Sequence, residues 1–185
     1  MREMIELINE NNRASAEEFD DAFEPVTFRD GPLEVFEPIL MIDGVTRRRY
    51  SPQMQEFFAL IDVWPEAYDG KTILSPRHQG AVLEKEAVKE ELRLTKVNFA
   101  PHPPAVPGDE RRTVVFAHEV QENWLAYLWW ETDTSEEPCV IDYNGGGVDM
   151  FASIRDFLST RSEGYTVSEA GMEVEARVVK RPPDG

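Results

Sequence analysis

The chain has 185 residues and a net charge of −17, and so acidic a protein repels nucleic acids and anionic membranes, whose binding depends on Lys and Arg. Four Trp, five Tyr and ten Phe exclude a disordered chain, and a single cysteine excludes an internal disulfide and a cysteine-rich zinc site. No apolar run approaches the ~20 residues of a membrane helix, and the first residues lack the apolar core of an export signal. We therefore expect a soluble, cytoplasmic protein with a single domain over 1–185.

The N-terminal part of the chain predicts helix followed by strand. Residues 1–25 form an acidic segment with two helical pieces, a short helix over 1–11 and a helical turn that Ser15 caps. Residues 26–42 alternate between apolar and polar side chains, which predicts two strands around a turn at 30–32.

A turn at 43–44 precedes a predicted helix with clear boundaries. Ser51 is a favourable N-cap and Pro52 suits the first helical position, so we expect the helix to begin there. Apolar residues follow at helical spacing, and Trp64 with the proline after it is expected to end the helix.

Residues 71–112 predict a strand, a helix, a strand and a loop. The pattern favours a short strand over 71–74, an amphipathic helix over 81–92 and a second strand over 94–99. Four prolines and a glycine then make 100–112 a loop of extended character, an insertion within one domain.

Strands dominate the next part of the chain. We expect strands at 113–116, 123–131 and 139–141. The middle one is apolar on both faces, which is typical of a strand at the centre of a sheet. The remaining elements follow in order: a loop at 144–147, a helix at 151–158, a strand at 172–179 and a frayed tail at 180–185.

The region 113–160 carries a pattern typical of one family. Its parts are a strand at 114–116, an aromatic-containing strand at 125–128, an acidic turn at 133–137, a Pro-x-Val strand at 138–140, a glycine loop at 145–147 and a small helix at 153–158. This pattern resembles the C-terminal core of the SUKH superfamily, which includes fungal Smi/Knr cell-wall regulators and many bacterial immunity proteins. Upstream, the Pro-centred helix at 51–58 is similar to an early helix of the same family.

The resemblance implies both a fold and a role. The implied fold is an α+β domain with a mostly antiparallel central sheet flanked by helices. Bacterial members are commonly immunity proteins that bind and neutralise a toxin domain of a polymorphic toxin system, and fungal members act as regulatory scaffolds. Neither role requires catalysis, so the resemblance implies a binding protein without a cofactor rather than an enzyme.

Two segments hold almost all of the negative charge. Residues 1–38 have 11 acidic and 3 basic side chains, and residues 115–160 have 9 and 1, whereas 39–114 are balanced. If both acidic segments lie on one side of the fold, their fields add into one negative face that favours a basic protein partner, such as a nuclease toxin domain. The acids that we select as candidate partner-binding residues are Glu17, Glu18, Asp20, Asp21, Glu119, Glu122, Asp133, Glu136 and Glu137.

Other motifs favour structural over chemical roles. His118 lacks the further ligands that a metal site needs, and Cys139 lacks a neighbouring base that would make it a nucleophile. The glycines of 144–147 lack the lysine of a phosphate loop, and the acids of 133–149 lack EF-hand spacing. The tryptophans of 123–131 favour a buried aromatic core over a stacking platform for sugars or bases.

Two further hypotheses stay open at this point. One is a regulatory or scaffold protein of the same fold with a different protein partner. The other is a small enzyme that uses paired carboxylates, which requires two acids to converge in a pocket where at least one has a raised pKa. No spacing in the sequence predicts such a pair, so we select no catalytic or metal-binding residue.

Overall fold

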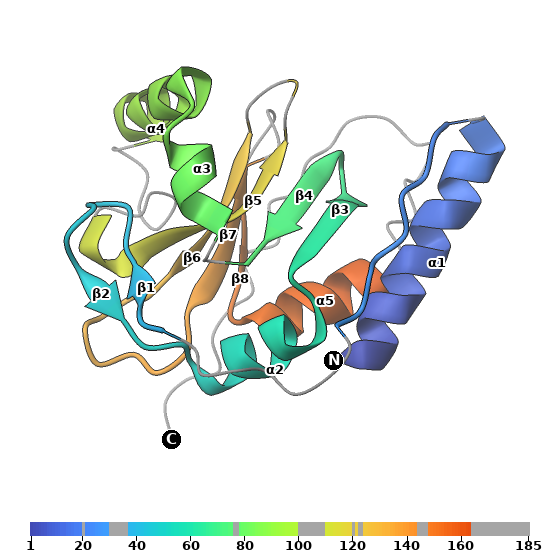
Figure 1. The fold of residues 1–185 in the computed structure, drawn as a ribbon, viewed down its shortest axis with the longest axis horizontal. Coiled ribbons are helices and arrows are strands. Elements are labelled where there is room, and N and C mark those ends of the chain that lie inside the picture. Colours follow the sequence, from blue (N-terminus) through green and yellow to red (C-terminus); the bar gives the residue numbers. More distant parts are fainter. Residues whose placement is uncertain are drawn as a thin grey trace.

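The computed structural model places most of the chain in one arrangement of helices around a sheet (Figure 1). It describes residues 1–19, 21–29, 37–75, 78–99, 110–119, 121, 124–143 and 148–163. The fold is α+β with an antiparallel sheet flanked by helices, which confirms the expected class.

The central sheet has six antiparallel strands whose spatial order follows their order in the chain. These strands are β3 (Val63–Tyr68), β4 (Lys71–Leu74), β5 (Thr113–Glu119), β6 (Leu125–Trp129), β7 (Cys139–Tyr143) and β8 (Val148–Phe151). A separate hairpin pairs β1 (Ile39–Leu40) with β2 (Arg47–Arg48). The predicted turn at 43–44 joins these two strands, and Gly44 adopts a φ of 71° in it.

Helices cover both faces of the sheet. On one face lie α1 (Arg2–Phe19), α2 (Pro52–Leu60) and α5 (Ile154–Ser162). The other face is covered by α3 (Gln79–Leu83) and α4 (Glu86–Phe99), and a short 3₁₀ helix, η2 (Glu110–Arg112), leads into β5. Within the described ranges, no helix has the length and apolar character needed to span a membrane.

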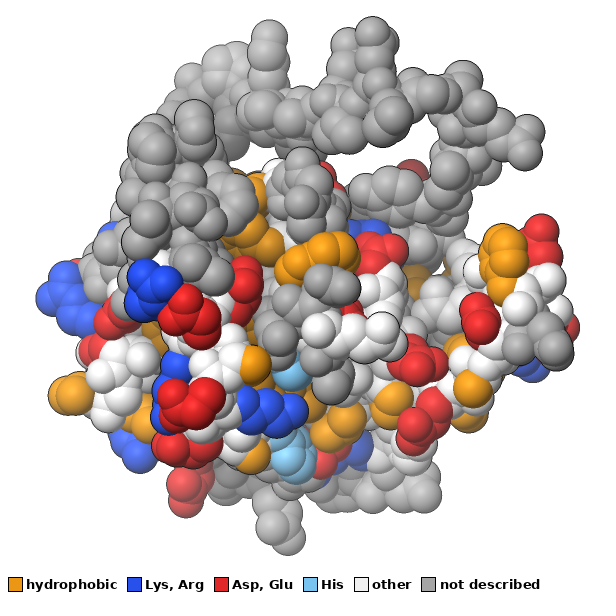
Figure 2. Space-filling view, turned by 90° about the horizontal axis from the view of Figure 1, so that it is seen from above, with side chains coloured by type: hydrophobic (Ala, Val, Ile, Leu, Met, Phe, Trp, Pro, Cys, Tyr) orange, Lys and Arg blue, Asp and Glu red, His pale blue; other side chains and the backbone are white. Residues whose placement is uncertain are grey.

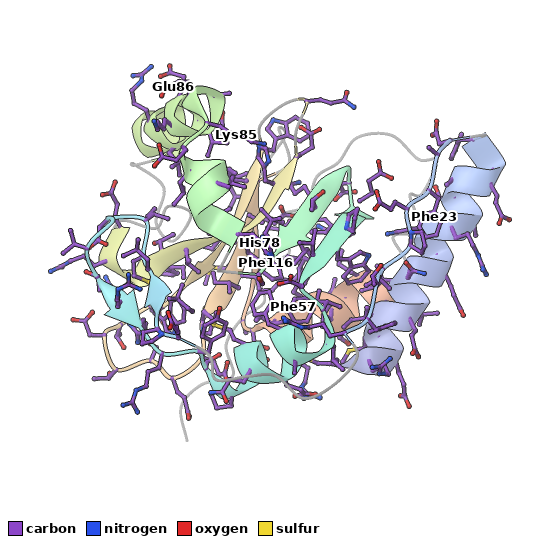
Figure 3. The ribbon with its side chains drawn as sticks, viewed as in Figure 1. Phe23, Phe57, His78, Lys85, Glu86 and Phe116 are labelled. Carbon is purple, nitrogen blue, oxygen red and sulfur yellow. The ribbon has the colours of Figure 1, made fainter. Side chains whose placement is uncertain are left out.

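Aromatic rings fill the face beneath α2 and α5. The ring of Phe157 on α5 contacts Phe116 on β5, Tyr68 on β3 and Phe151 on β8, with centroids 5.6, 5.1 and 5.3 Å apart. Phe57 on α2 points toward Phe116, with centroids 5.8 Å apart (Figure 3). A register shift between 115 and 117 lets β5 direct both Phe116 and its neighbour Ala117 to this face.

A smaller cluster lies on the opposite face, under α3 and α4. It joins Val82 and Val88 of these helices to alternate residues of β5, β6 and β7, among them Tyr127 and Tyr143. Every residue of β6 is buried, because helices cover both faces of the sheet, and this confirms the central strand expected from its doubly apolar pattern.

The N-terminal segment differs from its prediction. The structure has one continuous helix, α1, where a break near Asn11 and a capped turn at Ser15 were expected, so both expectations are wrong. Asn12 is the reason, because its side-chain amide donates to the backbone carbonyls of Glu66 and Ala67 at 3.2 and 2.8 Å. An asparagine that bonds to a neighbouring element does not compete for its own helix backbone.

The region after α2 also differs. Ser51 caps α2 as predicted, with its Oγ accepting from the Met54 N–H, but the helix ends at Leu60 and Trp64 lies in β3. Pro65 is tolerated there because β3 is an edge strand, and the register shift between Trp64 and Tyr68 marks an irregularity beside it. The chain forms a strand here instead of ending a helix, and the Trp64 side chain of that strand is buried in the core.

Four further parts of the sequence prediction are wrong. The single helix expected at 81–92 is divided into α3 and α4, and the strand expected at 94–99 is the last part of α4. A short apolar run has no period long enough to distinguish strand from helix, which explains this error. The strand β8 was not predicted, and the helix expected at 151–158 begins later, at Ile154, where Ser153 Oγ accepts from the Asp156 N–H.

Several predicted features lie outside the described residues. These are the turn at 30–32, most of the loop at 100–112, the loop at 144–147, the strand at 172–179 and the tail at 180–185. The end of the predicted loop, 110–112, is the 3₁₀ helix η2.

The aromatic cluster predicts a large effect of one truncation. Replacing Phe157 with alanine should reduce the free energy of unfolding by about 3–5 kcal/mol, because a buried ring with three aromatic neighbours is removed. Urea denaturation followed by tryptophan fluorescence measures the change. Phe19→Ala is the matched control, because the Phe19 ring is 68% exposed and its loss should change stability by less than about 0.5 kcal/mol. Equal losses for the two variants would contradict this packing.

Candidate functional site

A buried ionic cluster lies on the α5 side of the sheet. Lys71 and Asp142 are fully buried, and Arg161 is nearly so. Lys71 Nζ lies 3.3 Å from Asp142 Oδ1, and Arg161 Nη2 donates to Asp142 Oδ2 at 2.8 Å. Arg161 Nη1 also donates to Asp69, at 2.9 Å, and the Tyr68 hydroxyl donates to Asp142 Oδ1 at 3.2 Å. The Asp142 carboxylate therefore contacts polar side chains from three elements, β3, β4 and α5.

The strand register explains how the cluster forms. Asp142 on β7 is aligned across the sheet with Ala126 on β6 and Ala117 on β5, and all three face α5. Lys71 lies on β4, and two strands, β5 and β6, lie between β4 and β7. The alanines are short, so they leave space above β5 and β6 through which the lysine side chain can reach the carboxylate.

Burial and charge act in opposite directions on this carboxylate. Burial raises the pKa of Asp142, and the charges of Lys71 and Arg161 oppose that effect. Burial also raises the pKa of Tyr68 well above its ordinary value, and the charge of Asp142 adds to the increase. Both oxygens of Asp142 are engaged within the protein, so the cluster joins α5 and the β3–β4 hairpin to β7 rather than presenting a carboxylate to a ligand.

The candidate acids of α1 are exposed. Glu17, Glu18 and Asp21 all face solvent at the C-terminal end of the helix and just after it. Asp133 and Glu136 are exposed in the β6–β7 loop. This loop and the C-terminal end of α1 lie at opposite ends of the molecule, so the exposed acids of the loop and those of α1 do not form one negative face (Figure 1).

Two other selected acids are held by the protein itself. Glu119 is only 7% exposed, and its Oε1 accepts from the Gln121 N–H at 2.7 Å. Glu137 accepts from Ser51 Oγ at 2.5 Å and from the Gln53 N–H at 3.0 Å, so its carboxylate holds the start of α2. We therefore exclude both from the candidate interface. The remaining two, Asp20 and Glu122, lie outside the described residues.

The exposed acids near α1 form a surface that we call the acidic end. It consists of Glu10, Glu17, Glu18, Asp21, Glu24 and Glu66. The hydrogen bonds from Asn12 bring α1 against the backbone at Glu66, which unites the helix with the β3–β4 hairpin. Acidic side chains are visible along α1 on the right of Figure 2.

An exposed aromatic ring lies within the acidic end. The Phe19 side chain is 68% exposed, the most exposed aromatic among the described residues, and it directly follows Glu17 and Glu18. Phe23 is half-buried in the segment that runs back along α1 (Figure 3). An apolar ring surrounded by charges is typical of a protein-binding surface, because the ring gains from burial and the charges steer the partner.

The structure places the histidine, cysteine and tryptophan side chains that the sequence singled out mostly inside the protein. In the part of the chain that the structure describes, no group of three or more His, Cys, Asp and Glu side chains is placed to hold a metal ion. His118 is buried in β5, and Cys139 is half-buried in β7. Trp129 and Trp130 are buried, which confirms for them the aromatic core that the strand pattern predicts.

Comparison of the chain with family models, with curated proteins and with solved structures finds no match.

The ionic cluster predicts unequal effects of removing its members. Asp142→Leu should cost about 3–5 kcal/mol of unfolding free energy, because it leaves Lys71 and Arg161 buried without the shared carboxylate. Lys71→Met should cost only about 1–2 kcal/mol, because Asp142 keeps its bond to Arg161 and the methionine fills a similar volume. Urea denaturation of both variants tests the order, and a larger loss for Lys71→Met would contradict the arrangement.

The raised pKa of Tyr68 predicts loss of stability at high pH. Above the ordinary phenol pKa of 10.0, the unfolded chain releases this proton and the folded protein retains it, so the folded state binds more protons and stability falls as pH rises. We expect the decline to begin near pH 10 and to be shallower in Tyr68→Phe, which has no phenol at this position. Denaturant midpoints between about pH 8 and 11 measure it, and an unchanged slope in the variant would refute the assignment.

Proposed function

We propose that this protein is a SUKH-like immunity protein that binds and neutralises a basic toxin domain of a polymorphic toxin system. The proposal has the protein act in the cytoplasm, without catalysis and without a cofactor. The observation that carries it is the acidic end, where Phe19 is exposed among Glu17, Glu18 and Asp21. The α+β fold with a flanked antiparallel sheet is the one that the family resemblance implies, and this supports the proposal.

Electrostatics explains why an acidic end suits such a partner. A nuclease toxin carries Lys and Arg where it binds nucleic acid, so an acidic protein is attracted to that same surface and covers it. Charge attraction mainly raises the association rate and is weakened by salt. The exposed Phe19 ring supplies apolar area that salt does not weaken, and it favours slow dissociation once the two surfaces meet.

The proposal assigns binding to one end of the molecule only. Asp133 and Glu136 belong to the second acidic segment, yet they lie at the opposite end (Figure 1). One compact toxin domain that docks on α1 does not reach them. They therefore provide a matched control for charge changes, since they are exposed acids like those of the acidic end.

The test uses a toxin domain encoded beside the gene for this protein, and the absence of any such neighbouring gene would reject the immunity function. The triple variant Glu17→Lys/Glu18→Lys/Asp21→Lys should weaken binding about 10- to 100-fold, mainly through slower association, and the weakening should diminish as salt increases. Phe19→Ala should weaken binding mainly through faster dissociation. Surface plasmon resonance gives both rates, and survival of cells that express the toxin gives a second readout.

Asp133→Lys/Glu136→Lys should leave toxin binding nearly unchanged, because these side chains lie outside the acidic end. Equal weakening by this control would show that net charge alone matters and would overturn the assigned surface. Binding without protection of the cells would favour the regulatory scaffold, and an absence of binding in the wild-type protein would reject the immunity function.

A further inference from the structure

A basic groove lies at the end of the molecule that is remote from α1. It is an open hollow of about 490 Å³ lined by Thr46, Arg47, Arg48, Arg49, Arg111 and Asp133. Arg47 and Arg48 lie on β2, Arg49 follows it, and Arg111 lies on η2. A hydrogen bond from the Ile42 N–H to the Thr113 carbonyl, 3.0 Å long, holds the β1–β2 hairpin beside η2. Four arginines and one aspartate therefore line a groove in a protein whose net charge is −17.

The floor of this basic groove is held in place by Arg48. Its Nη2 donates to the carbonyls of Asp133 and Ser135 at 2.9 and 2.8 Å, and its guanidinium lies 4.8 Å from the centroid of the Trp130 ring. Burial lowers the pKa of Arg48, and the charge of Arg112 adds to this effect, whereas Asp133 opposes it. This guanidinium is committed to the fold, so it shapes the groove and adds charge to it.

The hairpin that presents the other arginines is also well ordered by hydrogen bonds. Asp43 Oδ1 accepts from the N–H groups of Val45 and Thr46 at 2.9 and 2.8 Å, and its Oδ2 accepts from Thr46 Oγ1 at 2.6 Å. These bonds fix the turn between β1 and β2. Arg47 and Arg49, which follow the turn, are exposed, as is Arg111 on η2, and Arg47 Nη1 donates to the Pro38 carbonyl at 3.1 Å. The groove therefore has a built frame and exposed arginine side chains.

We propose that the basic groove binds a small ligand that carries a diphosphate group. Guanidinium groups donate paired hydrogen bonds to phosphate oxygens, and a diphosphate has enough terminal oxygens to accept from arginines on both sides of the groove. A long polyanion such as nucleic acid is disfavoured, because it would extend beyond this groove onto an acidic protein. A small ligand meets only the lining of the groove, where four arginines outnumber the single Asp133.

The groove is separate from the acidic end, because β2, which carries most of the groove's arginines, lies at the opposite end of the fold from α1 (Figure 1). Binding at the groove is therefore independent of the proposed function. The exposed arginines Arg47, Arg49 and Arg111 carry the recognition, although one nitrogen of Arg47 also donates to the Pro38 carbonyl. Arg48 is a positioning residue, because it is half-buried and holds two backbone carbonyls and the Trp130 ring.

The test measures pyrophosphate binding by isothermal titration calorimetry at low salt. The wild-type protein should bind inorganic pyrophosphate, with an affinity that falls as salt increases. The triple variant Arg47→Gln/Arg49→Gln/Arg111→Gln should bind it at least about tenfold more weakly. Arg13→Gln/Arg93→Gln is the matched control, because both arginines are exposed on other helices, and it should bind like the wild type.

A comparison with ADP distinguishes two sources of the diphosphate. Tighter binding of ADP than of pyrophosphate would assign a nucleotide to the groove, and equal affinity would assign the diphosphate alone.

Circular dichroism of each variant shows that it is folded. The proposal is overturned if the wild type fails to bind either probe, if the triple variant binds like the wild type, or if the control variant loses as much affinity as the triple variant. Binding of a polyglutamate peptide, without binding of pyrophosphate, would also overturn it in favour of an acidic protein partner.

Discussion

The fold depends on one buried carboxylate, Asp142, which draws together parts of the chain that are far apart in sequence. Lys71 reaches it from β4 and Arg161 reaches it from α5, and the Tyr68 hydroxyl completes the set from β3. Burying these charges is costly, and only their mutual arrangement offsets the cost. The β3–β4 hairpin and α5 are consequently fixed relative to β7, and α1 rests on that hairpin through Asn12. The position of the acidic end is thus set by contacts that begin at this carboxylate.

Exposed acids occur at both ends of the molecule, on α1 and in the β6–β7 loop, whereas the arginines of the basic groove converge in one place, between β2 and η2. Total net charge conceals this groove, because the balanced central part of the sequence contributes its arginines. A cluster of like charges acts mainly over short range in salt, so a local basic site is compatible with an acidic protein.

Sequence patterns predicted the elements whose signals are local. Ser51 and Pro52 mark the start of α2, and the doubly apolar pattern marks β6 as a central strand. The continuous α1 was missed because Asn12 satisfies its side chain on β3, which no local pattern reveals. For the site, the charge pattern identified the exposed acids of α1. It could not show that the carboxylates of Glu119 and Glu137 accept hydrogen bonds within the protein. The ionic cluster could not be predicted, because it depends on the order of the strands that carry residues 71 and 142. The basic groove depends on the packing of β2 beside η2, and only the run of arginines at 47–49 is visible as a local signal in the sequence.

The edge strand β3 has a consequence for how the protein behaves at high concentration. Pro65 has no N–H, and Glu66 beside it adopts a φ of 46°, so the outer border of this strand lacks the regular row of donors that another strand would need. A second molecule cannot readily extend the sheet at this border. The chain thereby avoids one common route to aggregation while keeping a sheet whose other strands are built from strongly apolar residues.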